Sequence, residues 1–452
     1  MKTLFVSIFH GHIARNILLT DILKYLKESD LRVVVLCPEF KKDYYQTRFG
    51  GENIFYEGVS FPEPTTLDRF FRKLYYFFVD TETVRLIQGE NYLVHKKYLR
   101  YAFNRILTML LGHSRFLRNI IRYLDKKLVQ PQGLGYLFEK YNPDLVFVSS
   151  ITSDQDSMLL REVSSRKVST IGMIRSWDNL SVNKGNIRIY PGKLLVHNKY
   201  MKSDAISLAD FQPKDVEIVG MPHFDYYTND KRLSVEEISH QIGTDPQKKI
   251  ILFLMIGLSS GNLDHYIASA LEKLIASEPA LHNFQLVVRP HPNTEKKVQF
   301  SNSTVVNYPT LVEFQSARLT DREFTKEDLD MYASLIAHSE VVVSYQGTSI
   351  VDACALNKPI INIAFDEKLG TPYLKSMRHQ YEYTHLEPVL STGGVKVVYS
   401  ESELKEAVLN YISNPELDRA GRERVVEEQC FKLDGLSSFR VVEEISKAMH
   451  LI

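Results

Sequence analysis

Two short segments in the second half of the sequence carry residues suited to binding phosphate. In the first, Gly347, Thr348 and Ser349 follow an apolar run and open a short helix. The start of a helix has unpaired backbone N–H groups and the positive end of the helix dipole. Asp352, one turn later, is placed to reach a sugar hydroxyl. Phosphate beside a polyol indicates a nucleotide or a nucleotide-sugar as the ligand.

The second segment is Arg289-Pro-His-Pro292. Prolines on both sides of His291 prevent regular strand pairing and fix the loop. Arg289 offers a bidentate fork for phosphate and His291 a further donor, which favours an anion site over a purely structural turn. A third candidate phosphate loop contains Gly257, Ser259 and Ser260. The sequence lacks the glycine patterns of dinucleotide folds and P-loops, which argues against a tightly held NAD or FAD and against a P-loop kinase.

The first half of the chain offers candidate bases. His10, Gly11 and His12 follow the first apolar run and precede a helix. An imidazole takes a proton from an alcohol near neutral pH, although a helix cap or a polar loop also accounts for either histidine. Asp154 and Asp156 begin another helix, where one carboxylate caps the helix or orients a histidine.

A polar loop after a later strand, Arg175–Gly185, contains the only tryptophan of the chain. Loops that follow strands in this architecture usually lie near the ligand. The loop therefore predicts substrate contacts, with Asp178 as a rival base and Arg175 or Lys184 as an anion holder. Trp177 and Asn179 complete the candidate set. No spacing of His, Cys or Asp typical of a metal site occurs, so no metal and no other cofactor is predicted.

Near-continuous apolar runs alternate with helical stretches, which indicates a parallel sheet covered on both faces. The predicted strands are Thr3–Phe9, Leu31–Cys37, Asn53–Tyr56, Asp144–Ser149, Ser169–Ile174, Lys193–His197 and Val216–Val219, then Ile250–Ile256, Gln285–Arg289, Val305–Tyr308, Val341–Ser344, Pro359–Ile363 and Val395–Tyr399. We expect an α/β protein with two Rossmann-like doubly wound domains facing a cleft, at residues 1–242 and 246–424.

Between about residues 66 and 130 the alternation gives way to basic, aromatic stretches of helical spacing. Residues 68–130 hold 13 Lys and Arg against 5 Asp and Glu, whereas the whole chain has 55 of each. This helical insert in the N-terminal domain is either a solvated basic face, or a membrane-surface patch or docking face for an anionic lipid-linked acceptor.

Bulk properties exclude several classes of protein. Balanced charge argues against a nucleic-acid binder. Cys37, Cys354 and Cys430 lie far apart in apolar segments, which predicts buried thiols of a reducing compartment. No apolar run has the length of a membrane span or of a signal peptide. We therefore expect a cytoplasmic protein, with the insert as a candidate contact at the inner face of the cell membrane.

Taken together, these segments resemble glycosyltransferases with two Rossmann domains, the GT-B type. Gly11-His12-Ile13 before a helix is similar to the Gly-His of inverting members such as the plant UDP-sugar transferases. Arg289-Pro-His-Pro292 and Gly347-Thr-Ser-Ile-Val-Asp352 resemble CDP-glycerol glycerophosphotransferases and capsule glycosyltransferases of bacterial surfaces. Ser176-Trp-Asp-Asn179 and Gly220-Met-Pro-His-Phe-Asp225 are similar to the same enzymes.

The resemblance implies that the C-terminal domain binds a nucleotide-sugar, with a UDP-sugar as the default donor. Arg289, His291, Thr348 and Ser349 would hold its phosphates and Asp352 its ribose. His12 would act as the general base, with Asp154 as its orienting partner. The last segment, residues 425–452, would cross back onto the N-terminal domain.

The activity implied by the resemblance is metal-independent, inverting transfer of a sugar to a hydroxyl of a bacterial surface glycan or lipid-linked acceptor. Three alternatives stay open at this point. They are a CDP-polyol phosphotransferase, an enzyme like UDP-GlcNAc 2-epimerase, and a non-catalytic nucleotide-binding scaffold.

Overall fold

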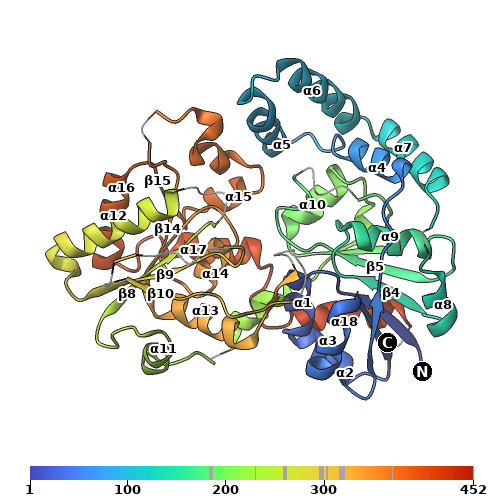
Figure 1. Ribbon diagram of the computed structural model, residues 1–452, viewed down its shortest axis with the longest axis horizontal. Helices are drawn as coiled ribbons and strands as arrows, with labels where there is room; N and C mark the ends of the chain where they lie inside the picture. The colour runs from blue at the N-terminus through green and yellow to red at the C-terminus, as the bar shows by residue number, and fades with distance from the viewer. Residues whose placement is uncertain are drawn as a thin grey trace. The chain divides into compact units, whose positions relative to one another are not determined.

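The chain forms two compact units. Unit 1 consists of Met1–Asp225 and Leu436–Ile452, and unit 2 of Tyr226–Gly435. The computed structural model describes residues 1–131, 133–182, 187–229, 231–257, 262–294, 300–301, 304–314, 321–368 and 370–450. Each unit is built around a parallel sheet (Figure 1).

Unit 1 has a seven-stranded sheet in the order β3-β2-β1-β4-β5-β6-β7. Its strands are β1 (Thr3–Ser7), β2 (Arg32–Pro38), β3 (Ile54–Val59), β4 (Leu145–Val148), β5 (Ser169–Met173), β6 (Lys193–Val196) and β7 (Val216–Ile218). All neighbouring strands are parallel. Along β1, Leu4 and Val6 enter the core on one face while Phe5 enters the core on the other. Both faces are covered, which explains why the strands are continuously apolar.

The helices of unit 1 cover these two faces. They are α1 (Gly11–Leu18), α2 (Asp21–Lys27), α3 (Lys42–Phe49), α8 (Gly135–Tyr141), α9 (Asp154–Val163), α10 (Lys199–Ser207) and α18 (Ser437–Ala448), with the insert α4 (Thr66–Tyr75), α5 (Glu82–Gln88), α6 (Tyr98–His113) and α7 (Arg115–Leu128) between β3 and β4. Val441, Ile445 and Met449 of the C-terminal segment lie in the same core as β1. Each such buried apolar side chain contributes roughly 1.5–3 kcal/mol to holding α18 on unit 1.

Unit 2 has a six-stranded parallel sheet in the order β10-β9-β8-β13-β14-β15 and a two-stranded antiparallel ribbon of β11 and β12. The strands are β8 (Lys249–Leu254), β9 (Phe284–Arg289), β10 (Thr304–Val306), β11 (Leu311–Val312), β12 (Glu323–Phe324), β13 (Ser339–Ser344), β14 (Ile360–Ile363) and β15 (Lys396–Val398). The helices are α11 (Val235–Ile242), α12 (Leu263–Ser277), α13 (Lys326–His338), α14 (Ser349–Ala355), α15 (Glu387–Leu390), α16 (Glu401–Ser413) and α17 (Arg419–Gln429). All thirteen predicted strands are confirmed within one to three residues at their ends, whereas β11 and β12 were missed.

The chain passes between the units at positions that differ from the expected ones. It enters unit 2 at Tyr226, before the expected boundary at 242–246, and returns to unit 1 at Leu436 rather than at 425. Asp225 accepts the backbone N–H groups of Ser437 (3.0 Å) and Ser438 (2.7 Å), and so fixes the start of α18. The helix α17 packs on α14 and stays in unit 2.

Strand order gives each sheet one point where the direction of winding reverses. In unit 1 this switch point lies between β1 and β4, and in unit 2 between β8 and β13. The loops that leave two such neighbouring strands turn to opposite faces of the sheet. A crevice therefore opens at their carboxyl ends, which is where ligands bind in open α/β sheets.

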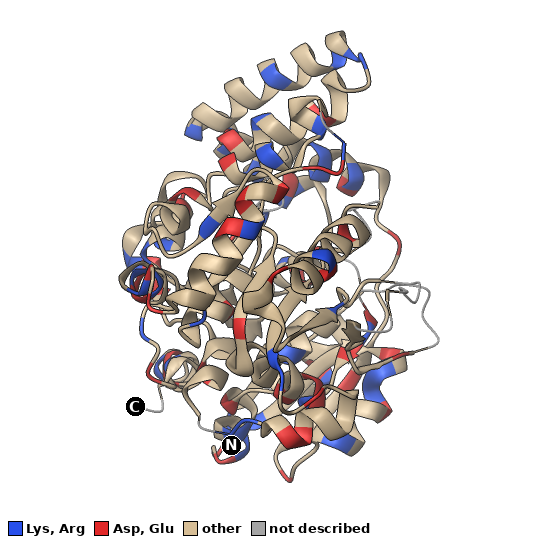
Figure 2. Ribbon diagram, turned by 90° about the vertical axis from the view of Figure 1, so that its left-hand side faces the viewer, with Lys and Arg blue, Asp and Glu red and all other residues tan. Residues whose placement is uncertain are grey.

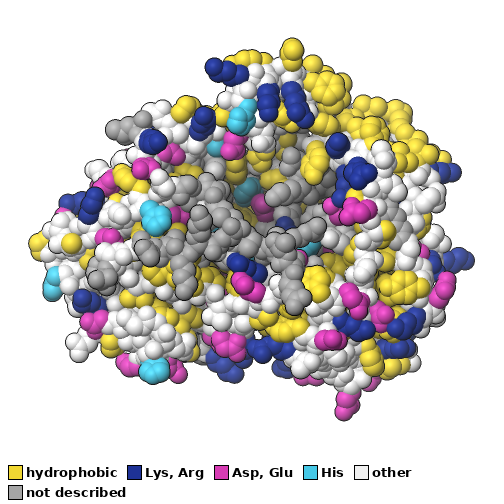
Figure 3. Space-filling view, viewed as in Figure 1, with side chains coloured by type: hydrophobic (Ala, Val, Ile, Leu, Met, Phe, Trp, Pro, Cys, Tyr) yellow, Lys and Arg dark blue, Asp and Glu magenta, His cyan; other side chains and the backbone are white. Residues whose placement is uncertain are grey.

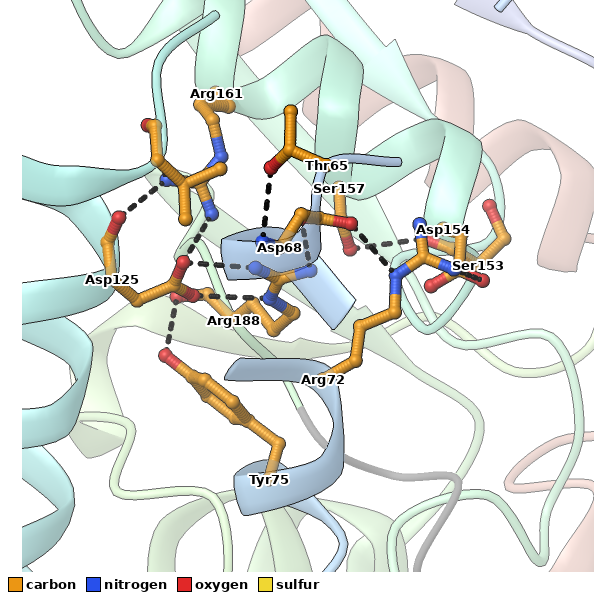
Figure 4. A network of polar contacts seen from close by, with 11 residues as sticks. Thr65, Asp68, Arg72, Tyr75, Asp125, Ser153, Asp154, Ser157, Arg161 and Arg188 are labelled. Atoms are coloured by element: carbon orange, nitrogen blue, oxygen red, sulfur yellow. Dashed lines mark hydrogen bonds and ion pairs between the residues drawn. The ribbon is translucent and has the colours of Figure 1, made fainter. Parts of the chain in front are cut away.

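Buried ion pairs attach the insert to the body of unit 1 (Figure 4). Arg188 donates to Asp68 of α4 at 2.9 Å and to Asp125 of α7 at 2.8 Å. Arg161 of α9 donates to Asp125 at 2.8 Å. Because each of these charges is compensated, removal of one partner would leave an unpaired buried charge and cost about 3–5 kcal/mol. The insert is therefore a fixed part of unit 1.

Candidate functional site

The pairing of β8 with β9 brings Gly257 and His291 together, beside the switch point of unit 2. Gly257 has φ +90°, and a Cβ atom at this position would lie 2.8 Å from Cβ of His291. Only glycine therefore fits here, because a side chain would meet the imidazole and would also be strained. The two residues follow β8 and β9, which are neighbours in the sheet. The structure thus joins two of the predicted phosphate-binding segments.

The protonation state of His291 is set by its surroundings. The backbone N–H of Asn293 donates to Nδ1 at 3.1 Å, so the proton of the neutral ring lies on Nε2. Burial lowers the pKa of His291, and the negative charge of Asp264 partly opposes this effect. Near neutral pH the ring is therefore a neutral donor through Nε2, which suits a phosphate oxygen without adding a fixed charge.

Asp264, in the first turn of α12, holds the loop after β8. Its carboxylate accepts the N–H groups of Ile256 at 3.3 Å and Gly257 at 3.1 Å, and it is 2% exposed. Burial and this carboxylate together raise the pKa of Tyr345, the residue that follows β13. Asp264 and Tyr345 were missed from the sequence. The available signal was an Asp at a helix start directly after a glycine-containing strand end.

Across the switch point, the hydroxyls of Ser344 and Ser349 lie 2.9 Å apart. Ser344 ends β13 and Ser349 begins α14, with the exposed Thr348 between them at the N-cap and Gly347 before it. The predicted strand–turn–helix is confirmed. Whether Gly347, Thr348 and Ser349 bind phosphate stays a prediction.

The guanidinium of Arg289 is buried inside unit 2. It is 5% exposed, donates to Asp328 at 2.8 Å and to the side-chain oxygen of Asn307, and lies 5.4 Å from the ring of Tyr332. Its charge is thus already compensated inside the unit, and the expectation that Arg289 holds phosphate stays a prediction. Its position fixes the end of β9, immediately before His291.

Asp352 is also buried, and its carboxylate accepts the hydroxyl of Tyr332 at 2.9 Å. The side chain thus links α14 to α13. The ribose contact expected of Asp352 stays a prediction.

The switch point of unit 1 carries the two predicted histidines. His10 is the N-cap of α1, but its side chain makes no capping hydrogen bond. His12 is half-buried in the first turn of the same helix, directly after β1. Both therefore lie on the ligand side of the sheet, as expected of residues that follow a parallel strand.

The carboxylate at this switch point is Asp156 and not Asp154. Asp156 is 1% exposed, accepts the hydroxyl of Ser7 at the end of β1, and accepts the hydroxyl of Ser153 at 2.8 Å. Burial raises its pKa to about 7, although hydrogen bonds from Ser7, Ser153 and the backbone of Ser150, and the charge of Arg175, oppose the rise. A carboxyl group that titrates near neutral pH at a ligand-binding edge is a candidate acid or base.

Asp154 points away from this group. It is half exposed and pairs with Arg72 of the insert at 2.6 Å (Figure 4). Asp154 thus has a partner in the insert, and its expected role in orienting His12 stays a prediction. Ser153 is the N-cap of α9, and Asp154 and Asp156 both lie in its first turn. Their carboxylates face opposite environments, because that of Asp154 is half exposed and that of Asp156 is buried.

The loop after β5 is held by its own side chains. Asn179 accepts the N–H of Ser176 at 3.2 Å and donates to Asp178 at 3.2 Å. Burial lowers the pKa of His197 to about 4, although the negative charge of the nearby Asp178 partly opposes this decrease. Trp177 packs partly against the core. The positive charge of Arg175 lowers the pKa of Asp156, so the loop does reach the switch point of unit 1.

Several predicted residues lie outside the described part of the chain, namely Ser259, Ser260 and Lys184. Within the described ranges, no three His, Cys, Asp or Glu side chains form a group suited to a metal ion. All three cysteines are described; each is buried and none is disulfide-bonded, as predicted.

Several solved structures share this fold along the whole chain. A Staphylococcus aureus MnaA–UDP structure is 15% identical, with a TM-score of 0.53 over 100% of this chain and 98% of that chain. The UDP-GlcNAc 2-epimerase of Neisseria meningitidis bound to UDP-GlcNAc is 15% identical, with a TM-score of 0.55 over 99% and 100%. A Rickettsia africae glycosyltransferase is 11% identical, with a TM-score of 0.53 over 99% and 98%. These likenesses confirm the GT-B fold.

Sequence comparison adds a family. No functionally curated protein matches the chain. Residues 169–447, more than half of the chain, match the family model described as CDP-Glycerol:Poly(glycerophosphate) glycerophosphotransferase. The matched region runs from β5 through α18 and so includes the whole of unit 2. The chain therefore belongs to the CDP-glycerol:poly(glycerophosphate) glycerophosphotransferase family, and is a transferase of GT-B fold.

Proposed function

We propose that this protein transfers a group from a nucleotide-activated donor to a hydroxyl of a bacterial surface glycan or of a lipid-linked acceptor. Unit 2 binds the donor and unit 1 the acceptor. His291 supports the donor assignment most directly: it is a neutral Nε2–H donor held against Gly257, which follows β8 beside the switch point.

In unit 1, His12 is the proposed general base. It removes the proton from the acceptor hydroxyl as the oxygen attacks the donor. Asp156, buried behind the end of β1, is a second proton acceptor in this edge of the sheet. Leaving-group charge is stabilised by protein donors in this proposal, without a metal ion.

Two transferred groups fit this arrangement. The first candidate is a sugar. In that case the acceptor oxygen attacks the anomeric carbon, the C–O bond to the diphosphate breaks, and a nucleoside diphosphate leaves. For a polyol phosphate, which the family match over residues 169–447 favours, the oxygen attacks the outer phosphorus instead. The pyrophosphate bond then breaks and a nucleoside monophosphate leaves.

The released nucleotide therefore distinguishes the two reactions. We expect UDP from a UDP-sugar if a sugar is transferred, and CMP from a CDP-polyol if a polyol phosphate is transferred. A thermal-shift screen of UDP, CDP, CMP, GDP and dTDP identifies the base first, because a ligand at 100 times its Kd stabilises the folded state by about 2.7 kcal/mol. Product formed without an acceptor would indicate an epimerase, and the absence of any turnover a scaffold.

The base is tested by His12→Ala, with His240→Ala as the matched control because His240 is an exposed histidine of α11. We expect His12→Ala to lower kcat by about 100-fold or more while the nucleotide still binds. His240→Ala should behave as the parent protein. Normal turnover by His12→Ala would refute the assignment.

A further inference from the structure

The antiparallel ribbon of β11 and β12 contacts the loop that carries His291. Leu311 of β11 lies opposite Phe324 of β12. Arg322, directly before β12, donates through its guanidinium to the backbone oxygen of Pro292 at 3.1 Å. Because Pro292 follows His291 in the chain, this hydrogen bond places the guanidinium beside the candidate phosphate-binding loop.

The base of the ribbon is joined to the end of β9 through Asp328. Its carboxylate accepts the N–H of Thr310 at 2.7 Å and the guanidinium of Arg289 at 2.8 Å. Thr325 donates its hydroxyl to the backbone oxygen of Thr310 at 3.3 Å, and caps α13 by accepting the N–H of Asp328 at 3.1 Å. Asp328 and Thr325 are buried. These hydrogen bonds fix the ribbon, and with it Arg322, against the loop after β9.

Arg322 also pairs with Glu313, at 2.9 Å, and this ion pair is open to solvent. The side chain of Glu313 is 68% exposed and that of Arg322 is 22% exposed. Water and salt screen such a pair, so it contributes little to stability. The pair of Arg289 with Asp328, by contrast, is buried on both sides. An anionic ligand therefore replaces Glu313 on Arg322 without leaving a buried charge unpaired.

A phosphate bound at His291 requires a positive charge nearby. Burial lowers the pKa of His291, so its ring is a neutral donor near neutral pH. The negative charge of Asp264 also lies close enough to act on that ring. A diphosphate at this place would therefore meet a neutral donor and a carboxylate, and it needs a cation to balance the repulsion.

The charge of the molecule as a whole does not supply this cation. The chain has 55 Lys and Arg and 55 Asp and Glu. Figure 2 shows Lys and Arg interspersed with Asp and Glu along the ribbon diagram, and in Figure 3 many basic side chains lie beside acidic ones. Mixed charges of this kind produce little field at a distance. The phosphate must therefore be held by a local charge.

We propose that Arg322 binds a phosphate of the donor beside His291, and that Glu313 is displaced when it does so. The inference rests on the proposed function, because it adds a residue to the donor site of unit 2. A guanidinium has five N–H donors, so one remains on Pro292 while two others hold the phosphate. The leaving phosphate gains negative charge as the bond to the transferred group breaks, and Arg322 stabilises that charge.

Inorganic pyrophosphate is the first probe, because it carries two phosphates without a base or a transferred group. Calorimetry uses the purified full chain, in which none of the described helices is long and apolar enough to cross a bilayer. Arg322→Gln should raise the Kd of pyrophosphate about tenfold or more, and Arg322→Lys, which keeps the charge but not the planar fork, should raise it less. An unchanged Kd for Arg322→Gln would overturn the proposal.

The matched control is Arg419→Gln. Arg419 is 52% exposed and pairs with Glu416 and Glu423 on α17 and the turn before it. Its replacement removes one positive charge from unit 2 without touching the ribbon, so the Kd of pyrophosphate should stay as in the parent protein. An equal loss in Arg419→Gln would overturn the proposal, because the effect would then depend on net charge alone.

The variant Glu313→Gln tests the exchange of partners. Removal of the competing carboxylate should lower the Kd of pyrophosphate by about two- to fivefold. Glu416→Gln, the same change at an exposed partner of Arg419, should leave the Kd unaltered. A ribbon that only supports the loop gives no gain in affinity. A Kd for Glu313→Gln that equals or exceeds that of the parent would therefore overturn the proposal.

Nucleotide binding separates failure of this inference from failure of the proposed function. CDP and UDP should bind to Arg322→Gln about tenfold or more weakly than to the parent protein. Equal affinity of the two proteins for the nucleotide would overturn the role of Arg322 and leave the donor assignment standing. A parent protein that binds neither pyrophosphate nor any nucleotide of the thermal-shift screen would overturn both.

Discussion

Asp156→Asn should stabilise this protein in alkaline solution. The carboxyl group lies behind the end of β1 with its side chain 1% exposed, and burial raises its pKa from the ordinary 3.8 to about 7. Asn has nearly the same shape as a protonated Asp, and the hydroxyl of Ser153 or Ser7 is able to accept from the new amide. The variant therefore removes the ionisable group with little change in packing.

The magnitude follows from the two pKa values. Below pH 4 the carboxyl is protonated in both states and affects stability little. As the pH rises from 4 to 7, the unfolded carboxyl ionises while the folded one keeps its proton, so the unfolded state is increasingly favoured. The loss levels off above pH 7 at about 4 kcal/mol. Between pH 5 and pH 9 it amounts to about 3 kcal/mol.

Urea unfolding from pH 5 to pH 9 measures this effect. We compare Asp156→Asn with Asp154→Asn, a matched change two residues away at a half-exposed side chain paired with Arg72. Relative to the parent protein, Asp156→Asn should be about 0–1 kcal/mol more stable at pH 5, because a weakened hydrogen bond of about 1 kcal/mol offsets most of the parent's loss there, and about 3 kcal/mol more stable at pH 9. Asp154→Asn should change stability by less than about 1 kcal/mol throughout.

Other titrating groups are common to all three proteins, so the difference between parent and variant isolates Asp156. A constant difference from pH 5 to pH 9 would refute the reasoning. It would mean that the carboxyl is solvated or paired with a charge in the folded state.

Three further predictions concern single side chains. Gly257→Ala should lower stability by more than about 1 kcal/mol and weaken nucleotide binding, because the added Cβ would displace His291; unchanged nucleotide Kd by calorimetry would contradict this. Arg289→Ala should cost about 3–5 kcal/mol, since it leaves Asp328 buried without its partner, and urea unfolding should show that loss whether or not nucleotide is present. His197, whose pKa is lowered to about 4 by burial, should contribute stability that is complete above pH 6.5 and falls as the pH drops towards 4. His197→Gln should flatten that acid limb, and an unaltered limb would contradict the assignment.

The strands were predictable because burial on both faces leaves a direct trace in the sequence. A run such as Val341–Ser344 is continuously apolar, and turn residues bound it. The ribbon of β11 and β12 leaves no such trace, because each strand has two residues and Leu311 and Val312 are only partly buried. Periodicity requires more residues than these strands contain.

The candidate site was predictable in part. Loops after parallel strands lie at one edge of a sheet, so the placement of His12 and His291 at such edges follows from the strand pattern. The close approach of His291 to Gly257 does not, because these residues are distant in sequence and meet only through the pairing of β8 with β9. The sequence also identified the insert as basic and aromatic, but its helical spacing does not state which side of α7 turns inward.

The sequence by itself determined where strands end and which residue types stand there, because secondary-structure period is a local property. The tertiary structure decided which of those residues are already occupied. Arg289 pairs with Asp328, 39 residues away, and Asp154 pairs with Arg72, 82 residues away. Asp156, two residues after Asp154 in the sequence, is instead buried under β1. Charge pairing and burial depend on which segments the fold brings together, and no local pattern contains that information.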